Sequence, residues 1–369
     1  MQKSLILVIV FVVGIGGGLA LRLWATGQAA NLTGPNQLQV LADGTVIAVG
    51  GEHFYVHTAE GLLKRKVATS LFGSEFYIGA FWALDDDTIV LRNDRLMDDS
   101  LSTGIKAFKR QRAASLFDGD YTGPGILQRC TLSTGRCESL GVGERVFHTR
   151  RIFGLAIDPA GERTVVADTT SWDLLELDSR GNMIRRAPRL FRFPNKVKWG
   201  AQGLWVADTN NHRLAKIDTS PNKFGAVQQA VPIPKGPNDD FIWPVSFAQA
   251  TSNTWFVINS NTDFNASRVD ILDQHGARVK SVALPAGADS LDMDSDGQRV
   301  LIADFKGFAI HAADLNGNSV TSFGSAEFKQ DMAALAQARG QYQLLAYIGL
   351  GMMGCVLIGL LVVSRLDSN

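Results

Sequence analysis

A repeated pattern in the middle of the chain constrains the fold more than any other feature. Residues 155–168 align without a gap onto residues 291–304, and the end of this unit recurs at 204–209 and, more loosely, at 255–260. Each copy gives an apolar strand, a polar turn and a second apolar strand, and two further strands follow, often around a D-x-x-G turn. Four short strands at a period of about 40 residues are typical of a β-propeller blade. The identical pairs are Leu155/Leu291, Asp158/Asp294, Gly161/Gly297, Arg163/Arg299, Ala167/Ala303 and Asp168/Asp304.

The repeat predicts an all-β fold, a six-bladed β-propeller over residues 25–324. We expect an insertion at 95–125 to interrupt the second blade, whose outer hairpin then resumes at 126–140. Residues 30–35 are a candidate closing strand, which the sequence does not prove. The six units are expected to begin near Gln37, Gly79, Phe153, Lys196, Val245 and Ser290.

Two uncharged apolar runs bracket this domain. Residues 4–21 lie between Lys3 and Arg22, and residues 344–363 lie between Arg339 and Arg365. Both runs have about the length that an α-helix needs to cross a bilayer. We therefore predict a transmembrane helix or signal anchor at 1–24, a juxtamembrane helix at 325–341, a transmembrane helix at 342–364 and a cytoplasmic tail at 365–369. Cleavage of the first run as a signal peptide is the alternative.

Two spans place both termini on the same side of the membrane. Cys130 and Cys137 flank a turn and are candidates for a disulfide across a hairpin, with two free thiols as the alternative. A disulfide requires an oxidising compartment. We therefore predict a two-pass protein of the cell inner membrane, with both termini cytoplasmic and the propeller in the periplasm.

Small residues recur at helical spacing in both apolar runs, and such faces let helices approach closely. The favoured interpretation is that the two spans pack on each other, and the alternative is a docking face for another membrane protein. The residues are Gly14, Gly18, Gly351, Cys355 and Gly359.

Residues 205–214 resemble the NHL repeat, whose name comes from the residues found here as Asn211, His212 and Leu214. The resemblance covers most of 37–322 as an architecture, and only the fourth blade carries the whole motif. In such propellers the Asp that ends the second strand is usually structural. This resemblance therefore implies a structural role for Asp168, Asp208 and Asp304.

Gly34-Pro35-Asn36, Pro194-Asn195 and Ala288-Asp289 each lie just before the innermost strand of a blade. These blade entries resemble, more weakly, those of strictosidine synthase-like, gluconolactonase and paraoxonase propellers. In those families Glu, Asn and Asp residues at these positions point into the central channel, and several bind a calcium ion that activates a lactone or ester. By position, the resemblance implies Asn36, Asn195 and Asp289 as calcium ligands. Asn36 replaces the usual Glu, and Lys196 stands where Gly follows the Asn, so an ammonium would oppose the cation.

The insertion at 95–125 mixes basic and aromatic residues, and a loop of this length inside a blade is often functional. Its partner would be an acidic protein, an anionic lipid headgroup or a glycan, and a solvated charged loop is the alternative. The candidate contact residues are Lys106, Phe108, Lys109, Arg110, Arg112 and Phe117.

The balance of 36 basic and 36 acidic residues excludes the electrostatic footprint of a dedicated nucleic-acid-binding protein. Three functional hypotheses remain. The first is a non-enzymatic binding or scaffold subunit of a cell-envelope complex, without a cofactor, that contacts the lipid bilayer and protein partners. The second is a calcium-dependent lactonase or esterase. The third is a small-ligand sensor that signals through a membrane partner.

Overall fold

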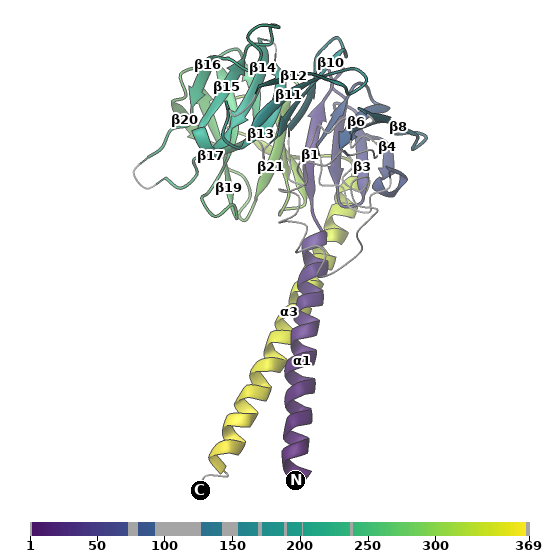
Figure 1. Cartoon of the computed structure of the whole chain (residues 1–369), viewed down its shortest axis with the longest axis vertical. Coiled ribbons are helices and arrows are strands. Elements are labelled where there is room, and N and C mark those ends of the chain that lie inside the picture. The colour runs from purple at the N-terminus through teal and green to yellow at the C-terminus, as the bar shows by residue number, and fades with distance from the viewer. Residues whose placement is uncertain are drawn as a thin grey trace.

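The computed structural model describes residues 2–72, 80–92, 127–141, 154–168, 172–187, 190–200, 202–236 and 239–366; for 2–10, 12 and 363–366 it describes only the backbone. Within these ranges, six four-stranded antiparallel sheets follow one another along the chain as the blades of a propeller (Figure 1). Blades one to three comprise β1 (Pro35–Val40), β2 (Val46–Gly50), β3 (His53–His57), β4 (Leu63–Ala68); β5 (Phe81–Ala83), β6 (Thr88–Arg92), β7 (Leu127–Thr131), β8 (Cys137–Leu140); β9 (Gly154–Ile157), β10 (Arg163–Asp168), β11 (Asp173–Asp178) and β12 (Met183–Ala187). Blades four to six comprise β13 (Pro194–Gly200), β14 (Gly203–Asp208), β15 (Arg213–Ile217), β16 (Val227–Pro232); β17 (Trp243–Thr251), β18 (Thr254–Ser260), β19 (Ser267–Asp273), β20 (Arg278–Ser281); β21 (Ser290–Ser295), β22 (Arg299–Asp304), β23 (Ala309–Asp314) and β24 (Val320–Phe323).

The predicted positions of the six blades are confirmed. The innermost strands β1, β5, β9, β13, β17 and β21 each begin within two residues of the expected position. The outer hairpin of blade two resumes as β7 and β8, as expected. The insertion at 95–125, with all six of its candidate contact residues, lies outside the described residues.

Over the described residues, the ring closes without a strand exchanged between blades. Each sheet takes four consecutive strands, and residues 30–35 supply no strand to blade six. Instead, Asn31 ends a helix and Pro35 begins the innermost strand of blade one. The amide of Gly34 donates to the Phe305 carbonyl at 3.0 Å, which ties the start of blade one to blade six. Side-chain and backbone contacts between these blades must therefore hold the ring together.

The core is divided into six clusters, one for each junction between neighbouring blades. Successive side chains of a strand point to opposite faces of its sheet, and each face meets a different blade. Leu155 of β9, for example, packs with Val90 and Leu127 of blade two, whereas Ala156 packs with Val197 of blade four. This explains why the strands are apolar on both faces, as in a doubly covered sheet.

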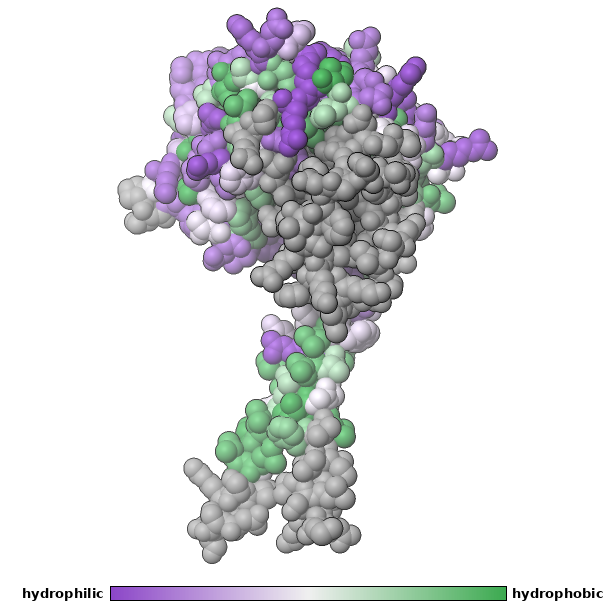
Figure 2. All heavy atoms as spheres, in the orientation of Figure 1, coloured by the Kyte–Doolittle hydropathy of each residue, from purple (hydrophilic) through white to green (hydrophobic). Residues whose placement is uncertain are grey.

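Two long helices, α1 (Gln2–Asn31) and α3 (Ala326–Leu366), run side by side from one face of the propeller, and both chain ends lie far from it (Figure 1). Figure 2 shows the contrast between the apolar surface of this stalk and the largely polar surface of the propeller. Over the described residues, the segment 326–362 of α3 is long and apolar enough to cross a membrane. Membrane insertion of α1 stays a prediction. The expected segments 325–341 and 342–364 form a single helix, and Ser325 Oγ caps it by accepting from the Phe328 amide at 3.1 Å.

Glycines bring the two stalk helices together. A Cβ on Gly14 would lie 2.3 Å from Val356 Cγ2, and one on Gly18 would lie 2.7 Å from the Gly349 carbonyl oxygen. Trp24 and Tyr342 meet edge to face at a centroid distance of 5.6 Å. The predicted small face of the second span is not part of this contact: Gly351 and Gly359 have no atom within 4 Å of an added Cβ, and Cys355 is exposed.

The first turns of α3 dock on the junction between blades six and one. Phe328 and Met332 are buried there with Phe323, and the Phe328 ring meets the Tyr55 ring edge to face at 4.9 Å. The Tyr55 hydroxyl donates to Asp331 Oδ2 at 2.9 Å, and Lys66 Nζ lies 2.7 Å from the same oxygen. We call this assembly, the blade six–blade one junction together with α3 from residue 326 to residue 336, the closed junction.

Candidate functional site

The innermost strands surround the central channel and run in the same direction. Lys196 of β13 pairs with Asp292 of β21, and two residues further along each strand Lys198 pairs with Asp294. The two strands are therefore parallel to each other. Gln37 and Gln39 of β1 reach Phe81 and Ala83 of β5 in the same way. Because β1 directly follows α1, these strands begin on the stalk side and end on the distal face (Figure 1).

Each innermost strand is a sheet edge with free backbone groups, which cost free energy if they stay buried and unpaired. Side chains of the preceding blade satisfy them. Asp292 Oδ2 accepts from the Leu38 amide at 3.1 Å, and Asp294 Oδ2 accepts from the Val40 amide at 2.8 Å. The side chains of Gln37 and Gln39 accept from the amides of blade two at 3.1 and 2.6 Å. Polar residues at alternate positions therefore have a structural use here.

Two lysines of blade four cross the channel to the carboxylates of blade six. Lys196 Nζ lies 2.7 Å from Asp292 Oδ2, and Lys198 Nζ lies 3.2 Å from Asp294 Oδ1. Ser246 of the intervening blade five donates to Asp292 Oδ1 at 2.7 Å. Burial raises the pKa of the Asp292 carboxyl, but the ammonium groups of Lys196 and Lys198 outweigh this and hold it below its ordinary value. We call these contacts the channel ion pairs; they link blades four, five and six and, through Leu38, blade one.

The three candidate calcium ligands lie at the stalk-side ends of the innermost strands β1, β13 and β21. Asn36 is buried at 4% exposure. Asn195 donates to Thr209 Oγ1 at 2.7 Å, and Asp289 Oδ2 lies 2.7 Å from Lys306 Nζ. Over the described residues, no three His, Cys, Asp or Glu side chains are grouped as a metal site would need. Because Asn195 and Asp289 are engaged by protein groups, these contacts do not favour the fit to calcium, and the site stays a prediction.

The expected opposition between Lys196 and a channel cation is replaced by an observed pairing. Its ammonium contacts Asp292, which follows the candidate ligand Asp289 on the same blade. The carboxylate oxygens of Asp292 accept from Leu38, Ser246 and Lys196. A carboxylate with these partners is a structural group rather than an available metal ligand.

The residues of the NHL-like motif hold the fourth blade to its loops. Asp208 is fully buried, and its carboxylate accepts from the Arg192 amide at 2.7 Å, Asn211 Nδ2 at 2.8 Å and Arg213 Nε at 2.8 Å. His212 Nδ1 lies 2.9 Å from the Ile242 carbonyl oxygen of the next blade. Asp304 has the same role in blade six, where it accepts from the amides of Asp289 and Gly307. The structural role predicted for Asp208 and Asp304 is therefore observed.

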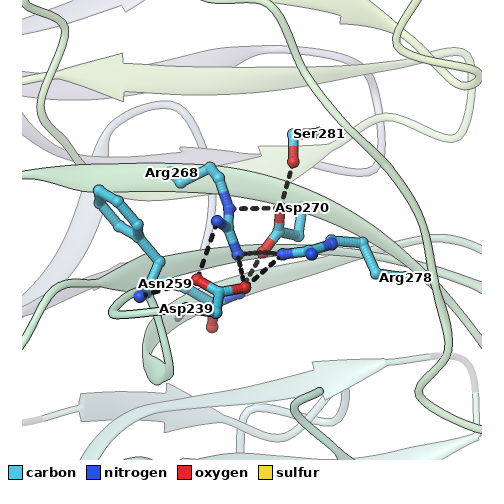
Figure 3. Close-up of polar contacts among 7 residues, drawn as sticks. Asp239, Asn259, Arg268, Asp270, Arg278 and Ser281 are labelled. Atoms are coloured by element: carbon cyan, nitrogen blue, oxygen red, sulfur yellow. Dashed lines mark hydrogen bonds and ion pairs between the residues drawn. The ribbon is translucent and has the colours of Figure 1, made fainter. Parts of the chain in front are cut away.

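A loop before blade five is held by the arginine–carboxylate cluster of Figure 3. The guanidinium of Arg268 donates to both oxygens of Asp239, at 3.0 and 2.9 Å, and to Asp270 at 2.8 Å. Arg278 adds a third hydrogen bond to Asp239 at 2.6 Å, and Ser281 donates to Asp270 at 2.6 Å. The hydrogen bonds from Arg268 and Arg278 lower the pKa of Asp239 to about 2. The guanidinium and carboxylate groups of the cluster are paired with one another, which is the chemistry of a structural tie.

The predicted pairing of Cys130 and Cys137 is present as a disulfide between β7 and β8, so the free-thiol alternative is wrong. The two residues are cross-strand partners in the register of this hairpin. Cys355 is a free cysteine.

Sequence reasoning missed the channel ion pairs. Lys196 and Lys198 are two residues apart on one innermost strand, and Asp292 and Asp294 are two residues apart on another. With the blades aligned by their starts, these pairs occupy matching positions with opposite charge. That signal was present in the sequence, but it required a pairing between blades four and six, which are not adjacent.

No family model matches this chain, and no curated protein matches it. Solved structures that match include a virginiamycin B lyase from Staphylococcus aureus, at 12% identity over 79% of this chain and 84% of that chain, with a TM-score of 0.48. The Cps50 (Swd1) β-propeller domain of Myceliophteria thermophila matches at 10% identity over 79% of this chain and 97% of that chain, with a TM-score of 0.48. A nidogen/laminin complex matches at 13% identity over 80% and 93%, with a TM-score of 0.45. At these identities the matches carry nothing about activity.

Proposed function

We propose that this protein is a membrane-anchored, extracytoplasmic propeller that acts as a non-enzymatic binding or scaffold subunit of a cell-envelope complex. The observation that carries the proposal is the set of channel ion pairs. Asp292 and Asp294 bind lysines and backbone amides, so these channel carboxylates serve to close the ring. A propeller closed in this way presents rigid loops on its two faces, which suits recognition of a partner.

The anchoring part of the proposal is a two-pass topology with both termini in the cytoplasm. It is supported by the apolar segment of α3 and by the glycine-mediated contact between α3 and α1. The docking of Phe328 and Asp331 on blade one ties the orientation of the propeller to the direction of α3. A periplasmic location is supported by the Cys130–Cys137 disulfide, since such bonds persist in oxidising compartments.

The proposed contact surface includes the insertion at 95–125, with its basic and aromatic residues. We also propose that residues 205–214 form an NHL-like repeat. Asn211 and His212 support this, because both make contacts that hold the fourth blade to its loops. The proposed partner is a protein of the envelope, held next to the lipid bilayer.

Thermal unfolding of the full-length protein in nanodiscs, with calcium and then with chelator, tests the scaffold against the calcium-dependent hydrolase. The full chain is needed because α3 is part of the closed junction. Binding at a hundredfold excess over Kd would add about 2.7 kcal/mol to the free energy of unfolding. The scaffold proposal predicts no calcium-dependent shift. A rise in melting temperature that Asp289→Ala abolishes would instead support the hydrolase.

Alkylation of thiols in intact cells tests the location. After acid quenching and denaturation, a periplasmic propeller should leave Cys130 and Cys137 unlabelled until a reductant is added, whereas Cys355 should be labelled directly and serves as an internal control. Direct labelling of all three cysteines would contradict the extracytoplasmic location.

A further inference from the structure

A cavity of about 370 Å³ opens between blades four and five at the distal end of the innermost strands. Its volume falls at the lower end of the range for small-molecule sites. Trp205 and Trp255 line it, with their ring centroids 4.4 Å apart, and Phe247 packs on Trp255. Polar side chains, including Gln249, complete the wall. We call the blade four–blade five junction around Trp205, Phe247 and Trp255, with its cavity, the open junction.

Trp205 carries a buried hydrogen-bond donor without a partner. The residue is 1% exposed, and its Nε1 has no acceptor among the residues that the structure describes. A Cβ on Gly200, which also lines the cavity, would lie 3.8 Å from Trp205 Cδ1, the atom bonded to Nε1. The Cδ1–Nε1 edge of the indole therefore lies beside Gly200, one of the residues that line the cavity. An unpaired buried donor costs free energy, which a ligand acceptor would recover.

The charges at the cavity are already neutralised. Lys198 lines it, but its ammonium pairs with Asp294, which lines it too. A ligand with a net charge would thus meet no free counter-charge among the described residues that line the cavity. A quaternary ammonium would also meet the positive edge of the Trp205 N–H, which opposes a cation.

Gln249 supplies an adjustable amide at the same wall. Its Nε2 makes a long contact of 3.4 Å with the Ser252 carbonyl, and its Oε1 would lie 3.0 Å from a Cβ on Gly200. An amide donates and accepts, so it can pair with a hydroxyl group in either direction. Thr251, Ser252 and Ser295 add further hydroxyl groups to the lining.

We propose that the open junction binds a neutral mono- or disaccharide unit. Such a unit offers ring and hydroxyl oxygens to the Trp205 N–H, hydroxyl groups to Gln249, and an apolar C–H face to the aromatic wall. A purely apolar ligand would leave the indole donor unpaired. The proposal goes beyond the scaffold function, because it concerns a different site and holds whether or not the insertion binds a protein.

Ligand-observed NMR of the full-length protein in nanodiscs tests the proposal, since nanodiscs avoid competing sugar detergents. The probes are N-acetylglucosamine, glucose and cellobiose, each at up to ~10 mM, a range that reveals millimolar Kd values. Choline and acetate are the charged comparisons. We expect at least one sugar to bind and neither charged probe to bind. No binding by any of the three sugars, or binding of choline or acetate alone, would overturn the proposal.

Two variants locate the binding. Trp205→Phe keeps an aromatic ring and removes the N–H, and it should weaken sugar binding about tenfold, the effect of losing one good hydrogen bond. Because Trp205 is buried, Gly200→Val provides a second test: it places methyl groups in the cavity wall and should abolish binding with the melting temperature retained. Trp243→Phe is the matched control, since Trp243 meets Phe264 edge to face and is not among the residues that line the cavity. Equal binding by Gly200→Val and the unaltered protein would also overturn the proposal.

Discussion

The closed junction and the open junction are built from the same kind of strands but are finished differently. At the closed junction, Phe328 and Met332 of α3 fill the apolar space, and Asp292 pairs the edge amide of Leu38. At the open junction, Trp205 and Trp255 meet beside a cavity, and the Trp205 N–H has no partner among the described residues. The hollow between blades six and one, by contrast, has no aromatic side chain among its described lining residues.

This difference indicates that the closed junction stabilises the ring, whereas the open junction is available to bind a ligand. A ring of blades without an exchanged strand must be held where its first and last blades meet, and that is where the helix and the carboxylates lie. The junction between blades four and five lies away from this closure and tolerates a gap. Unsatisfied polar atoms occur at both junctions, Trp205 Nε1 beside the cavity and the ring nitrogens of His57 beneath α3, and a ligand is proposed only for the first.

The largest effect is expected for Lys196→Met. The substitution removes the ammonium from Asp292, which is 2% exposed, and leaves a buried carboxylate without its lysine. We expect a loss of about 3 kcal/mol in the free energy of unfolding, measured from the melting temperature of the full-length protein.

The double variant Lys196→Met/Asp292→Asn is the control for this prediction. The amide is uncharged and its oxygen still accepts from Leu38, so at least half of the loss should be recovered. If the double variant is no more stable than Lys196→Met, the effect does not come from an unpaired charge.

Removal of the α3 anchor should have the next largest effect. Phe328→Ala empties a site that is 1% exposed, and we expect a loss of ~3 kcal/mol together with faster hydrogen exchange in β1 and β3. Phe264→Ala, at an exposed aromatic on blade five, is the matched control and should change stability little. Equal effects of the two substitutions would contradict the role of α3 in closing the ring.

The closed junction should also weaken in acid because of His57. This side chain is fully buried between Phe323 and Phe328, neither ring nitrogen has a partner within the described chain, and burial lowers its pKa from 6.5 to about 4. Above pH 6.5 both folded and unfolded chains carry a neutral imidazole at this position. Between these pKa values only the unfolded chain takes up the proton. The free energy of unfolding therefore decreases as the pH is lowered, by at most about 3 kcal/mol.

His57→Phe keeps an aromatic ring that cannot titrate. Melting temperatures measured from about pH 7.5 down to about pH 4 should fall less steeply for this variant than for the unaltered protein. Parallel curves for the two proteins would show that another group controls the response.

The smallest effect on stability is expected at the open junction. Gln249→Ala removes a half-buried amide with one long contact, so the free energy of unfolding should change by less than about 0.5 kcal/mol. Saccharide binding should nevertheless weaken. A loss of stability as large as that of Phe328→Ala would show that the cavity wall is structural.

Periodic information in the sequence was enough to predict the propeller. The repeat at residues 155–168 and 291–304 gave six blade positions, and the Cys130–Cys137 hairpin followed from the turn between them. The D-x-x-G turns also formed as expected: Asp178 accepts from the Asn182 amide, and Gly181 adopts a φ of 84°.

Such local patterns could not predict the contacts between distant blades. The pairing of Lys196 with Asp292 spans 96 residues and skips blade five, so neither residue alone indicates it. The buried, unpaired ring nitrogens of His57 and the unpaired N–H of Trp205 depend on which face of a blade meets which neighbouring blade. The face that Gly351 and Gly359 present on α3 depends on helix rotation, which small-residue spacing did not determine.

Residue-resolved hydrogen exchange of the full-length protein in nanodiscs tests the central claim most directly. The amides of Leu38 and Val40 bond only to the carboxylates of Asp292 and Asp294 among the contacts described, so their exchange reports the closed junction itself. We predict that they exchange as slowly as the core of β2, through global unfolding, whereas the amides of Gln202 and Ser252 beside the cavity exchange quickly. Fast exchange at Leu38 and Val40, equal to that at the cavity, would contradict a ring closed by the channel ion pairs.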